Sequence, residues 1–514
     1  MLKDMFRILL MVVICVSTCA AFPAHAIDCS TWLSTPTLFE KRISSAGSEV
    51  TGWNIAGTYA PMRSQIFDAV DNRIWASCDE QQASINHTSL NRRTWTTGGV
   101  TLQCTAYNTP PQAYTDVGQV AFVNNSSYNY GPIIVHTLGL PFIDQPPTAN
   151  QVISRTFDQS NATGMCTFSV VNTRTLPNPI VTGGSNMTYT SDGLYNDPVT
   201  VGPTFVPFRS FGNIVALGHS INTCTGVCQI PNPRFKTYLQ RTKIENTFTN
   251  TNYADDVTFN SMFLTDRDAV PFGQSLPVSE RAHTLTVLTD TSQTGLPITG
   301  AGYLIAGQAE FKSSQIGGRN GMSLMVMRVA DSGSLKVVNG GLLAWPAINS
   351  LLSTDGDTGI FDAIKVTKIL RKGTAGGFYV VGTVANSAAA TPLLRAPRGF
   401  IVAFNSNGTF DTTFGSNGLV LVDNMLTTDR ALIADAVVLT NGKPVVVMQD
   451  PAGLLTGSVR TQRFLTTGAV DTTWGSNGVR LFPITGCTNP AIDNLLVVTN
   501  SINELFIGGS GHHN

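Results

Sequence analysis

The chain has 514 residues, of which only 13% are charged, and its formal net charge is −1. This balance provides no basic surface for nucleic acid and no polybasic segment for a membrane surface, so we expect neither partner. The 47 glycines, together with many Thr, Ser and Asn residues, are typical of a turn-rich β protein.

Residues 1–26 are predicted to be a secretory signal peptide. Lys3 and Arg7 precede an apolar run, and Ala24-His25-Ala26 places small residues at both recognition positions of a cleavage site. The run is too short for a membrane anchor, and we expect no membrane span elsewhere in the chain. The mature chain, 27–514, is therefore predicted to be secreted, periplasmic or attached to the cell surface.

Cysteines beyond the leader should mostly pair in an oxidising compartment. Cys224 and Cys228 are predicted to close a small loop, because no second Cys/His pair lies nearby to complete a zinc site. Cys29 and Cys487 form a second candidate pair that would join the two ends of the mature chain. The odd total leaves at least one cysteine free or bonded to another chain. The seven are Cys29, Cys78, Cys104, Cys166, Cys224, Cys228 and Cys487.

Short apolar runs that follow a Gly- or Asn-containing turn recur along the whole chain, as expected for β-strands. The copies are faint in 58–205 and clearer in 206–514, where their spacing tightens to sixty residues. A smaller C-terminal propeller behind a separate N-terminal β domain is the alternative to one continuous array. The seven runs are residues 71–77, 131–137, 212–218, 302–307, 376–382, 442–448 and 503–508.

The clearest repeated motif is Asp411-Thr-Thr-Phe-Gly-Ser-Asn-Gly418, which returns sixty residues later as Asp471-Thr-Thr-Trp-Gly-Ser-Asn-Gly478. A fixed period of this size marks a tandem array of one supersecondary unit. A single four-stranded unit cannot bury both of its faces, whereas a ring of units buries each face against a neighbour. We therefore predict an all-β fold, a seven-bladed β-propeller with blades of about 60 to 90 residues.

The same residues resemble the bacterial delta-60 repeat, which has an aspartate-x-x-phenylalanine-glycine-x-x-glycine turn and an aspartate-glycine-lysine-type hairpin in each unit. Residues 411–418 and 471–478 match the turn, and Asn441-Gly442-Lys443 matches the hairpin. The resemblance is clear over about 300–514 and implies a β-propeller of four-stranded blades. It implies no particular activity or cofactor.

Closure of the ring is predicted to join the two ends of the chain. The last unit stops at 508–514, where other units begin their outer strands, and open strand edges are costly. Residues 42–57 align without gaps with 463–478, and Arg42, Gly47, Thr51, Trp53 and Gly57 match their counterparts. We therefore expect residues 27–57 to complete the last blade. The main difference between the two aligned segments is Val50, which stands where the other segment has the turn residue Asp471.

An acidic residue recurs just before the predicted first strand of several units, at Asp68, Asp362, Asp435 and Asp493, with His283 in an intervening unit. The first strands of a propeller line its central channel, so one hypothesis is a ring of carboxylates that binds Ca²⁺. The favoured alternative is that each carboxylate accepts backbone N–H groups at a blade-to-blade turn. Both hypotheses place the four residues at equivalent positions near one end of the channel.

Catalytic motifs are not evident in the sequence. There is no Gly-x-Ser-x-Gly elbow, and the histidines of the mature chain before the C-terminal His-His stand alone in sequence. We therefore predict an exported, monomeric binding or scaffold module for a protein or glycan ligand, without a cofactor. The alternative is an extracellular propeller hydrolase or lyase with a site at the central channel.

Overall fold

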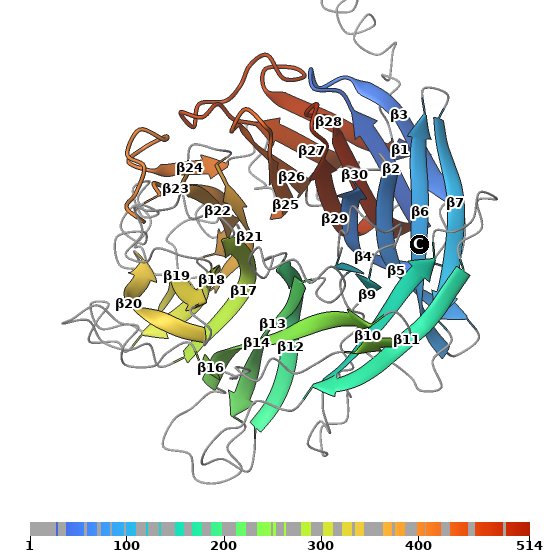
Figure 1. Cartoon of the computed structure of the whole chain (residues 1–514). Helices are drawn as coiled ribbons and strands as arrows, with labels where there is room; N and C mark the ends of the chain where they lie inside the picture. Colours follow the sequence, from blue (N-terminus) through green and yellow to red (C-terminus); the bar gives the residue numbers. More distant parts are fainter. Residues whose placement is uncertain are drawn as a thin grey trace, which may run out of the picture.

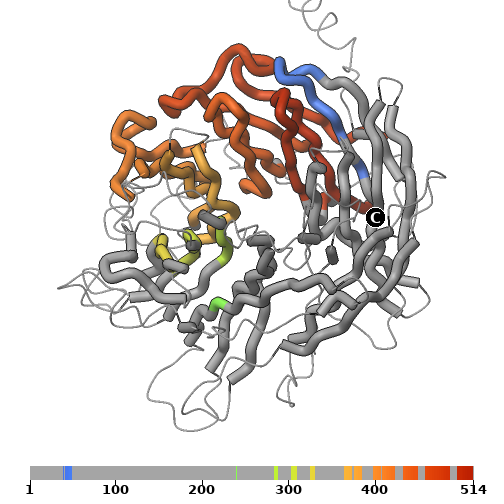
Figure 2. Tube along the Cα trace, viewed as in Figure 1, coloured from blue at the N-terminus to red at the C-terminus, as the bar shows by residue number. Residues whose placement is uncertain are grey.

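The computed structural model is all β, with its sheets arranged around a ring (Figure 1). It describes strands β1 to β30 and the connecting residues 44–48, 372, 376–377, 405–406, 408–418, 439–443, 464–478, 486 and 500–504. Side chains are described for part of these residues, mostly between 364 and 512, which Figure 2 shows in colour. The predicted signal peptide lies outside the described residues.

The N-terminal half contributes one four-stranded sheet and two pairs of strands, all antiparallel. The sheet consists of β4 Tyr59–Asp68, β5 Arg73–Gln82, β6 Ile85–Thr96 and β7 Gly99–Asn108. The pairs are β8 Val120–Ala121 with β9 Ile133–Ile134, and β10 Asn150–Asp158 with β11 Thr167–Leu176. The next sheet consists of β12 Met187–Asp197, β13 Gly212–Asn222, β14 Arg234–Thr247, β15 Asn250–Asn252 and β16 Met262–Phe263.

The C-terminal half contributes three further sheets in which chain neighbours pair antiparallel. The first consists of β17 Ser279–Leu288, β18 Gly302–Phe311, β19 Gly321–Asp331 and β20 Leu335–Leu343. The second consists of β21 Ala363–Arg371, β22 Phe378–Ala385, β23 Arg398–Phe404 and β24 Leu419–Val422. The third consists of β25 Leu432–Val438, β26 Pro444–Asp450, β27 Ser458–Arg463 and β28 Val479–Thr485.

The closing sheet combines both ends of the chain, in the order β29-β30-β2-β3. Its strands are β29 Pro490–Thr499, β30 Leu505–His513, β2 Thr37–Ile43 and β3 Glu49–Ile55. β2 runs antiparallel to β30 with Arg42 opposite Phe506, the arrangement that the alignment of 42–57 with 463–478 predicts. β1 Ile27–Asp28 pairs with β28 of the preceding sheet. Cys29, Cys487, Cys224 and Cys228 lie outside the described residues, so both disulfides stay predictions.

Propeller-type blades account for the sheets of four antiparallel strands. All seven apolar runs identified in the sequence contain residues of second strands, namely β5, β9, β13, β18, β22, β26 and β30. β4 packs beside β29, so residues 59–108 belong to the ring and not to a separate N-terminal domain (Figure 1). The number of seven blades stays a prediction, because β8 to β11 form two separate pairs.

The core lies between neighbouring sheets, as a ring of sheets requires. Tyr379 and Val381 of β22 pack with Val446 and Met448 of β26 in one apolar cluster. The next cluster joins the β25–β28 sheet to the closing sheet; Phe39 and Ile43 of β2 lie in it with Trp474 of the repeat motif. Each sheet therefore buries a face only because its neighbour is present.

The repeated Asp-x-x-aromatic-Gly motif forms the turn between third and fourth strands. Gly415 and Gly475 both have φ +54°, a conformation that favours glycine, and a Cβ on either would lie within 2.4 Å of a backbone oxygen. The glycines of the motif are therefore needed for the backbone conformation of this turn. Among the described residues the structure has no helix with the length and apolar character needed to cross a membrane.

Candidate functional site

The first strands of successive sheets lie side by side around the middle of the ring. β12 contacts β17, β17 contacts β21, β21 contacts β25, β25 contacts β29, and β29 contacts β4 (Figure 1). Side chains on these strands are therefore the ones that a central site would use.

Every one of these six strands carries a β-bulge four to six residues before its end. One extra residue at a bulge bends the strand and re-aims a side chain, and bulges are frequent beside active sites. Five of the six bulge residues are polar. They are Arg63, Asp192, His283, Thr367, Ala434 and Asp493.

Two bulge side chains that the structure describes bind the next first strand. His283 Nδ1 accepts a hydrogen bond from the backbone N–H of Val366, at 3.0 Å. Thr367 Oγ1 donates to the carbonyl oxygen of Ile433, at 3.2 Å. The bulges therefore fix neighbouring first strands to one another at this level of the channel.

Asp435 lies one residue beyond the bulge of β25 and joins three sheets. Its Oδ1 accepts from the Lys368 ammonium at 2.9 Å and from the backbone N–H of Ala436 at 2.8 Å, while Oδ2 accepts from Val497 N–H at 2.8 Å. The side chain is only 8% exposed. These contacts agree with the favoured alternative to a metal site, in which the carboxylate accepts hydrogen bonds from backbone N–H groups between blades.

The four aspartates do not occupy equivalent positions, so the predicted register is wrong. Asp68 is the last residue of β4, opposite Arg73 at the hairpin, whereas Asp493 lies in the bulge of β29 and Asp435 just after that of β25. Asp362 lies outside the described residues. The sequence pattern failed because it placed the first strands too late in the chain: Asp68 ends β4, and Asp435 and Asp493 lie inside β25 and β29.

Calcium at these aspartates stays a prediction. Within the described part of the chain, no group of three His, Cys, Asp or Glu side chains is placed to hold a metal ion. At Asp435, an ammonium and two backbone N–H groups already surround the carboxylate.

Replacing Asp435 with Asn should lower the free energy of unfolding by about 2 to 4 kcal/mol, because the amide cannot pair with Lys368 or accept both N–H groups. Urea unfolding of the purified protein measures this change. Lys365→Ala, at an exposed position of β21, is the control and should change stability by less than about 0.5 kcal/mol. Equal stability of both variants and wild type would contradict the three-sheet role of Asp435.

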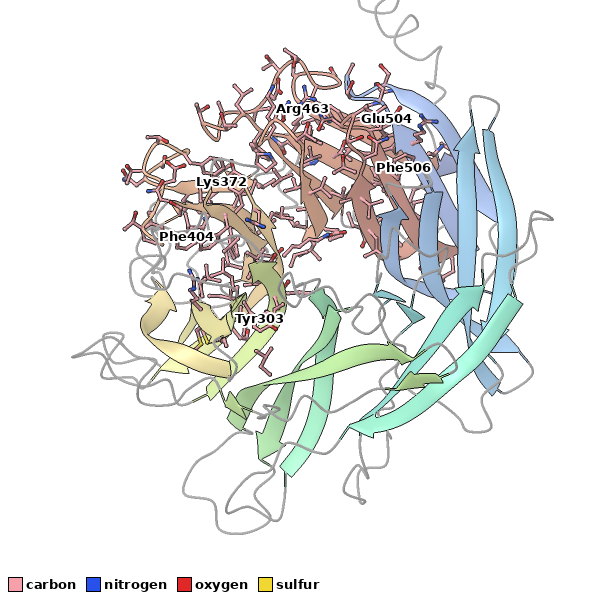
Figure 3. All side chains as sticks on the ribbon, viewed as in Figure 1. Tyr303, Lys372, Phe404, Arg463, Glu504 and Phe506 are labelled. Atoms are coloured by element: carbon pink, nitrogen blue, oxygen red, sulfur yellow. The ribbon has the colours of Figure 1, made fainter. Side chains whose placement is uncertain are left out.

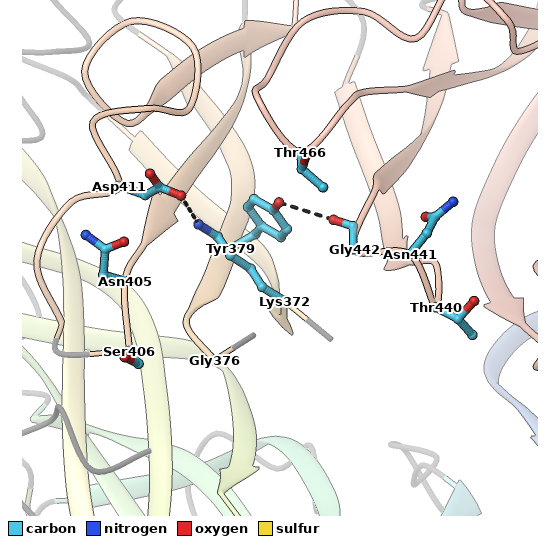
Figure 4. Close-up of a pocket in the computed structure, with 10 residues that line it drawn as sticks. All are labelled: Lys372, Gly376, Tyr379, Asn405, Ser406, Asp411, Thr440, Asn441, Gly442 and Thr466. Atoms are coloured by element: carbon cyan, nitrogen blue, oxygen red, sulfur yellow. Dashed lines mark hydrogen bonds and ion pairs between the residues drawn. The ribbon is translucent and has the colours of Figure 1, made fainter. Parts of the chain in front are cut away.

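A second candidate site is a cavity of about 440 Å³ between the β21–β24 and β25–β28 sheets, which sequence analysis did not find (Figure 4). Its wall is rich in neutral groups that donate or accept hydrogen bonds, with one ion pair and one tyrosine. The lining residues are Lys372, Gly376, Tyr379, Asn405, Ser406, Asp411, Thr440, Asn441, Gly442 and Thr466.

Two ionisable groups of this inter-sheet pocket, Asp411 and Tyr379, have pKa values shifted away from neutral pH. Burial raises the pKa of Asp411, but hydrogen bonds from Lys372 and Thr413 outweigh burial and hold that pKa below its usual range. Burial and the charge of Asp411 raise the pKa of Tyr379 to about 12. The Tyr379 hydroxyl donates to the carbonyl oxygen of Gly442 at 3.2 Å. The pocket is therefore suited to binding more than to proton transfer.

No protein-family model matches the sequence, and no curated protein matches it either. Solved structures of similar fold include a levansucrase variant of B. megaterium, at 10% identity and a TM-score of 0.35, with 86% of this chain and 90% of that chain covered. A full-length β-fructofuranosidase from Microbacterium saccharophilum has 10% identity, a TM-score of 0.33 and coverage of 78% and 82%. A levansucrase from Gluconacetobacter diazotrophicus has 10% identity, a TM-score of 0.30 and coverage of 72% and 84%.

All three of these proteins are named as enzymes, which contradicts the predicted function of a binding or scaffold module. The alternative, a propeller hydrolase, agrees with them better. At TM-scores of 0.30 to 0.35 the likeness carries no reaction or substrate over to this chain. It does not test the delta-60 resemblance, which stays a prediction.

Proposed function

We propose that the chain is an exported propeller hydrolase that cleaves a glycosidic bond in its central channel. The observation that supports this proposal is the set of first-strand bulges, because Asp192, His283 and Asp493 are the bulge residues of three first strands. Arg63 and Thr367 occupy the same kind of position. Export and a monomeric state belong to this proposal.

Glycoside hydrolysis needs two carboxyl groups, one as general acid and the other as base or nucleophile. Asp192 and Asp493 come from sheets that are not neighbours in the chain order, β12 and β29, so the ring itself would bring them to the substrate. Arg63 is suited to binding a hydroxyl-rich substrate through its several donors. His283 has Nδ1 engaged by Val366, which fixes its ring.

Activity of the purified mature chain on a panel of oligosaccharides and polysaccharides tests the proposal, with new reducing ends as the readout. Asp192→Asn and Asp493→Asn should each lower kcat by about 10² to 10⁴ without loss of the folded state, because each removes a carboxyl group that acts as acid, base or nucleophile. Asp68→Asn, at the opposite end of a first strand, is the matched control and should keep full activity.

Two results would contradict the proposal. Unsaturated products would identify a lyase and rule out hydrolysis. Equal kcat for the wild type and both channel variants, with the folded state verified by circular dichroism, would place the reaction elsewhere.

A further inference from the structure

An arginine recurs at one register position in the third strand of the sheets. In five of the six sheets with four or more strands it pairs with a residue near the start of the second strand. The pairs are Arg92 with Trp75, Arg241 with Val215, Arg328 with Leu304, Arg463 with Val445, and Arg42 with Phe506. In the β21–β24 sheet the same position is Ala403, opposite Tyr379.

Arg463 shows what this arginine does where its surroundings are described. Its Nε lies 2.9 Å from Asp471 Oδ2, and Nη2 donates to Thr473 Oγ1 at 3.0 Å. Nη1 donates at 2.8 Å to the carbonyl oxygen of Ser45, which belongs to the next sheet. The guanidinium carbon lies 4.7 Å from the centre of the Trp474 ring. The planar guanidinium group of Arg463 thus fills the junction between the two sheets.

The preceding junction has the same turn but no arginine, and its lysine, Lys372, follows the first strand, whereas Lys443 precedes the second strand. Asp411 Oδ1 accepts from Thr413, as Asp471 Oδ1 does from Thr473. A Cβ on Gly468 would lie 2.6 Å from Gly415 N, as one on Gly47 would lie 2.8 Å from Gly475 N. The two junctions therefore superpose, and Thr466 takes the place of Ser45.

The inter-sheet pocket adjoins the place that corresponds to the guanidinium of the next junction, because Asp411 and Thr466 both line it (Figure 4). The Lys372 ammonium lies over the Phe414 ring, 6.0 Å from its centre, as Arg463 lies over Trp474. Asp411 binds one cation, Lys372 at 2.6 Å, whereas Asp471 binds both Lys443 at 2.7 Å and Arg463. The Asp411 side chain is also 19% exposed, against 3% for Asp471. Lys372 supplies a point charge, but an ammonium cannot provide the planar set of donors of an arginine.

We propose that this pocket binds the guanidinium group of a ligand, either the arginine side chain of a polypeptide or a free guanidino compound. Asp411 Oδ2 accepts its N–H groups beside Lys372, whose ammonium lies 4.8 Å from the centre of the buried Tyr379 ring. Asn405 and Asn441 at the rim contact whatever group the guanidinium is attached to. This site is independent of the channel and of any hydrolysis there.

Calorimetric titration of the full mature chain tests the site, with N-acetyl-arginine amide as the probe and N-acetyl-citrulline amide as its uncharged isostere. The arginine compound should bind at least about tenfold more tightly, because a charge-assisted pair with Asp411 is lost in citrulline. Asp411→Asn should weaken arginine binding by a similar factor. Asp471→Asn, the same change in the neighbouring junction, is the matched control and should leave binding unchanged.

Ala403→Arg places a guanidinium at the position that the other sheets give to arginine, so it should abolish binding. If this variant fails to fold, the citrulline comparison and the Asp411→Asn variant decide the question. Methylguanidine and acetyl-Gly-Arg-Gly amide separate the two sources: tighter binding of the peptide supports a polypeptide ligand, and equal binding supports a small one. Equal affinity for arginine and citrulline compounds, or for wild type and Asp411→Asn, would overturn the proposal.

Discussion

A chain that begins at residue 58 should fail to form a stable monomer. The deletion removes β2 and β3, and β30 then presents unpaired backbone groups along a whole edge. It also removes Phe39 and Ile43 from the cluster around Trp474, and each of these side chains alone contributes about 2 to 5 kcal/mol by comparison with other buried residues. Size-exclusion chromatography and thermal unfolding by circular dichroism measure the loss.

The matched control is a chain that begins at residue 27, which keeps β2 and β3 and should unfold like the full chain. A synthetic peptide of residues 27–57, added to the deleted chain, should restore the transition, because pairing with β30 needs no covalent link. A deleted chain that unfolds cooperatively at the temperature of the control would show that the closing sheet contributes little.

Removing Arg463 should have the second largest effect. Arg463, labelled in Figure 3, forms a buried pair with Asp471 at 2.9 Å. Loss of one partner leaves the other charge buried without full compensation. Arg463→Met should lower the free energy of unfolding by about 3 to 5 kcal/mol. Lys443→Met is the comparison: this ammonium contacts the same carboxylate but is more exposed, so its loss should cost clearly less.

The pH dependence of unfolding gives a second readout of this cluster. Burial raises the pKa of Asp471, but hydrogen bonds from Lys443 and Thr473 and the charge of Arg463 outweigh burial and hold the pKa well below its usual range. Because the pKa of Asp471 is lower in the folded state, its ionisation stabilises the fold at pH values above the unfolded-state pKa of about 3.9. This stabilisation disappears as the pH falls below about 3.9 toward the folded-state pKa. The stability of Asp471→Asn should therefore fall less steeply than that of wild type between about pH 4 and pH 2. Parallel curves would contradict this role of Asp471.

The closing sheet shows how an irregular copy of the repeat keeps the same interaction. Val50 replaces the turn aspartate there, which left the turn in doubt from sequence alone. In the structure Arg42 instead forms a two-pronged pair with Glu504, at 2.9 and 3.0 Å, from the hairpin position that Lys443 has in the preceding sheet (Figure 3). The acidic partner has moved from the turn to the hairpin, and the arginine has stayed.

The sequence by itself determined the all-β class, the second strands and the joining of the two chain ends. These follow from local signals: apolar runs after glycine turns, and a motif such as 471–478 whose glycines adopt positive φ. The arginine series could also have been found, by aligning third strands, because Arg241, Arg328 and Arg463 are visible in the sequence.

Only the tertiary structure decided which side chains meet. Asp435 and Asp493 are similar in sequence context, but Asp435 lies one residue beyond the bulge of β25, whereas Asp493 lies in the bulge of β29. The inter-sheet pocket depends on Asp411, Tyr379 and Thr466, which come from two sheets and meet only across their junction. Contacts of this kind arise from packing between distant segments, which local periodicity does not encode.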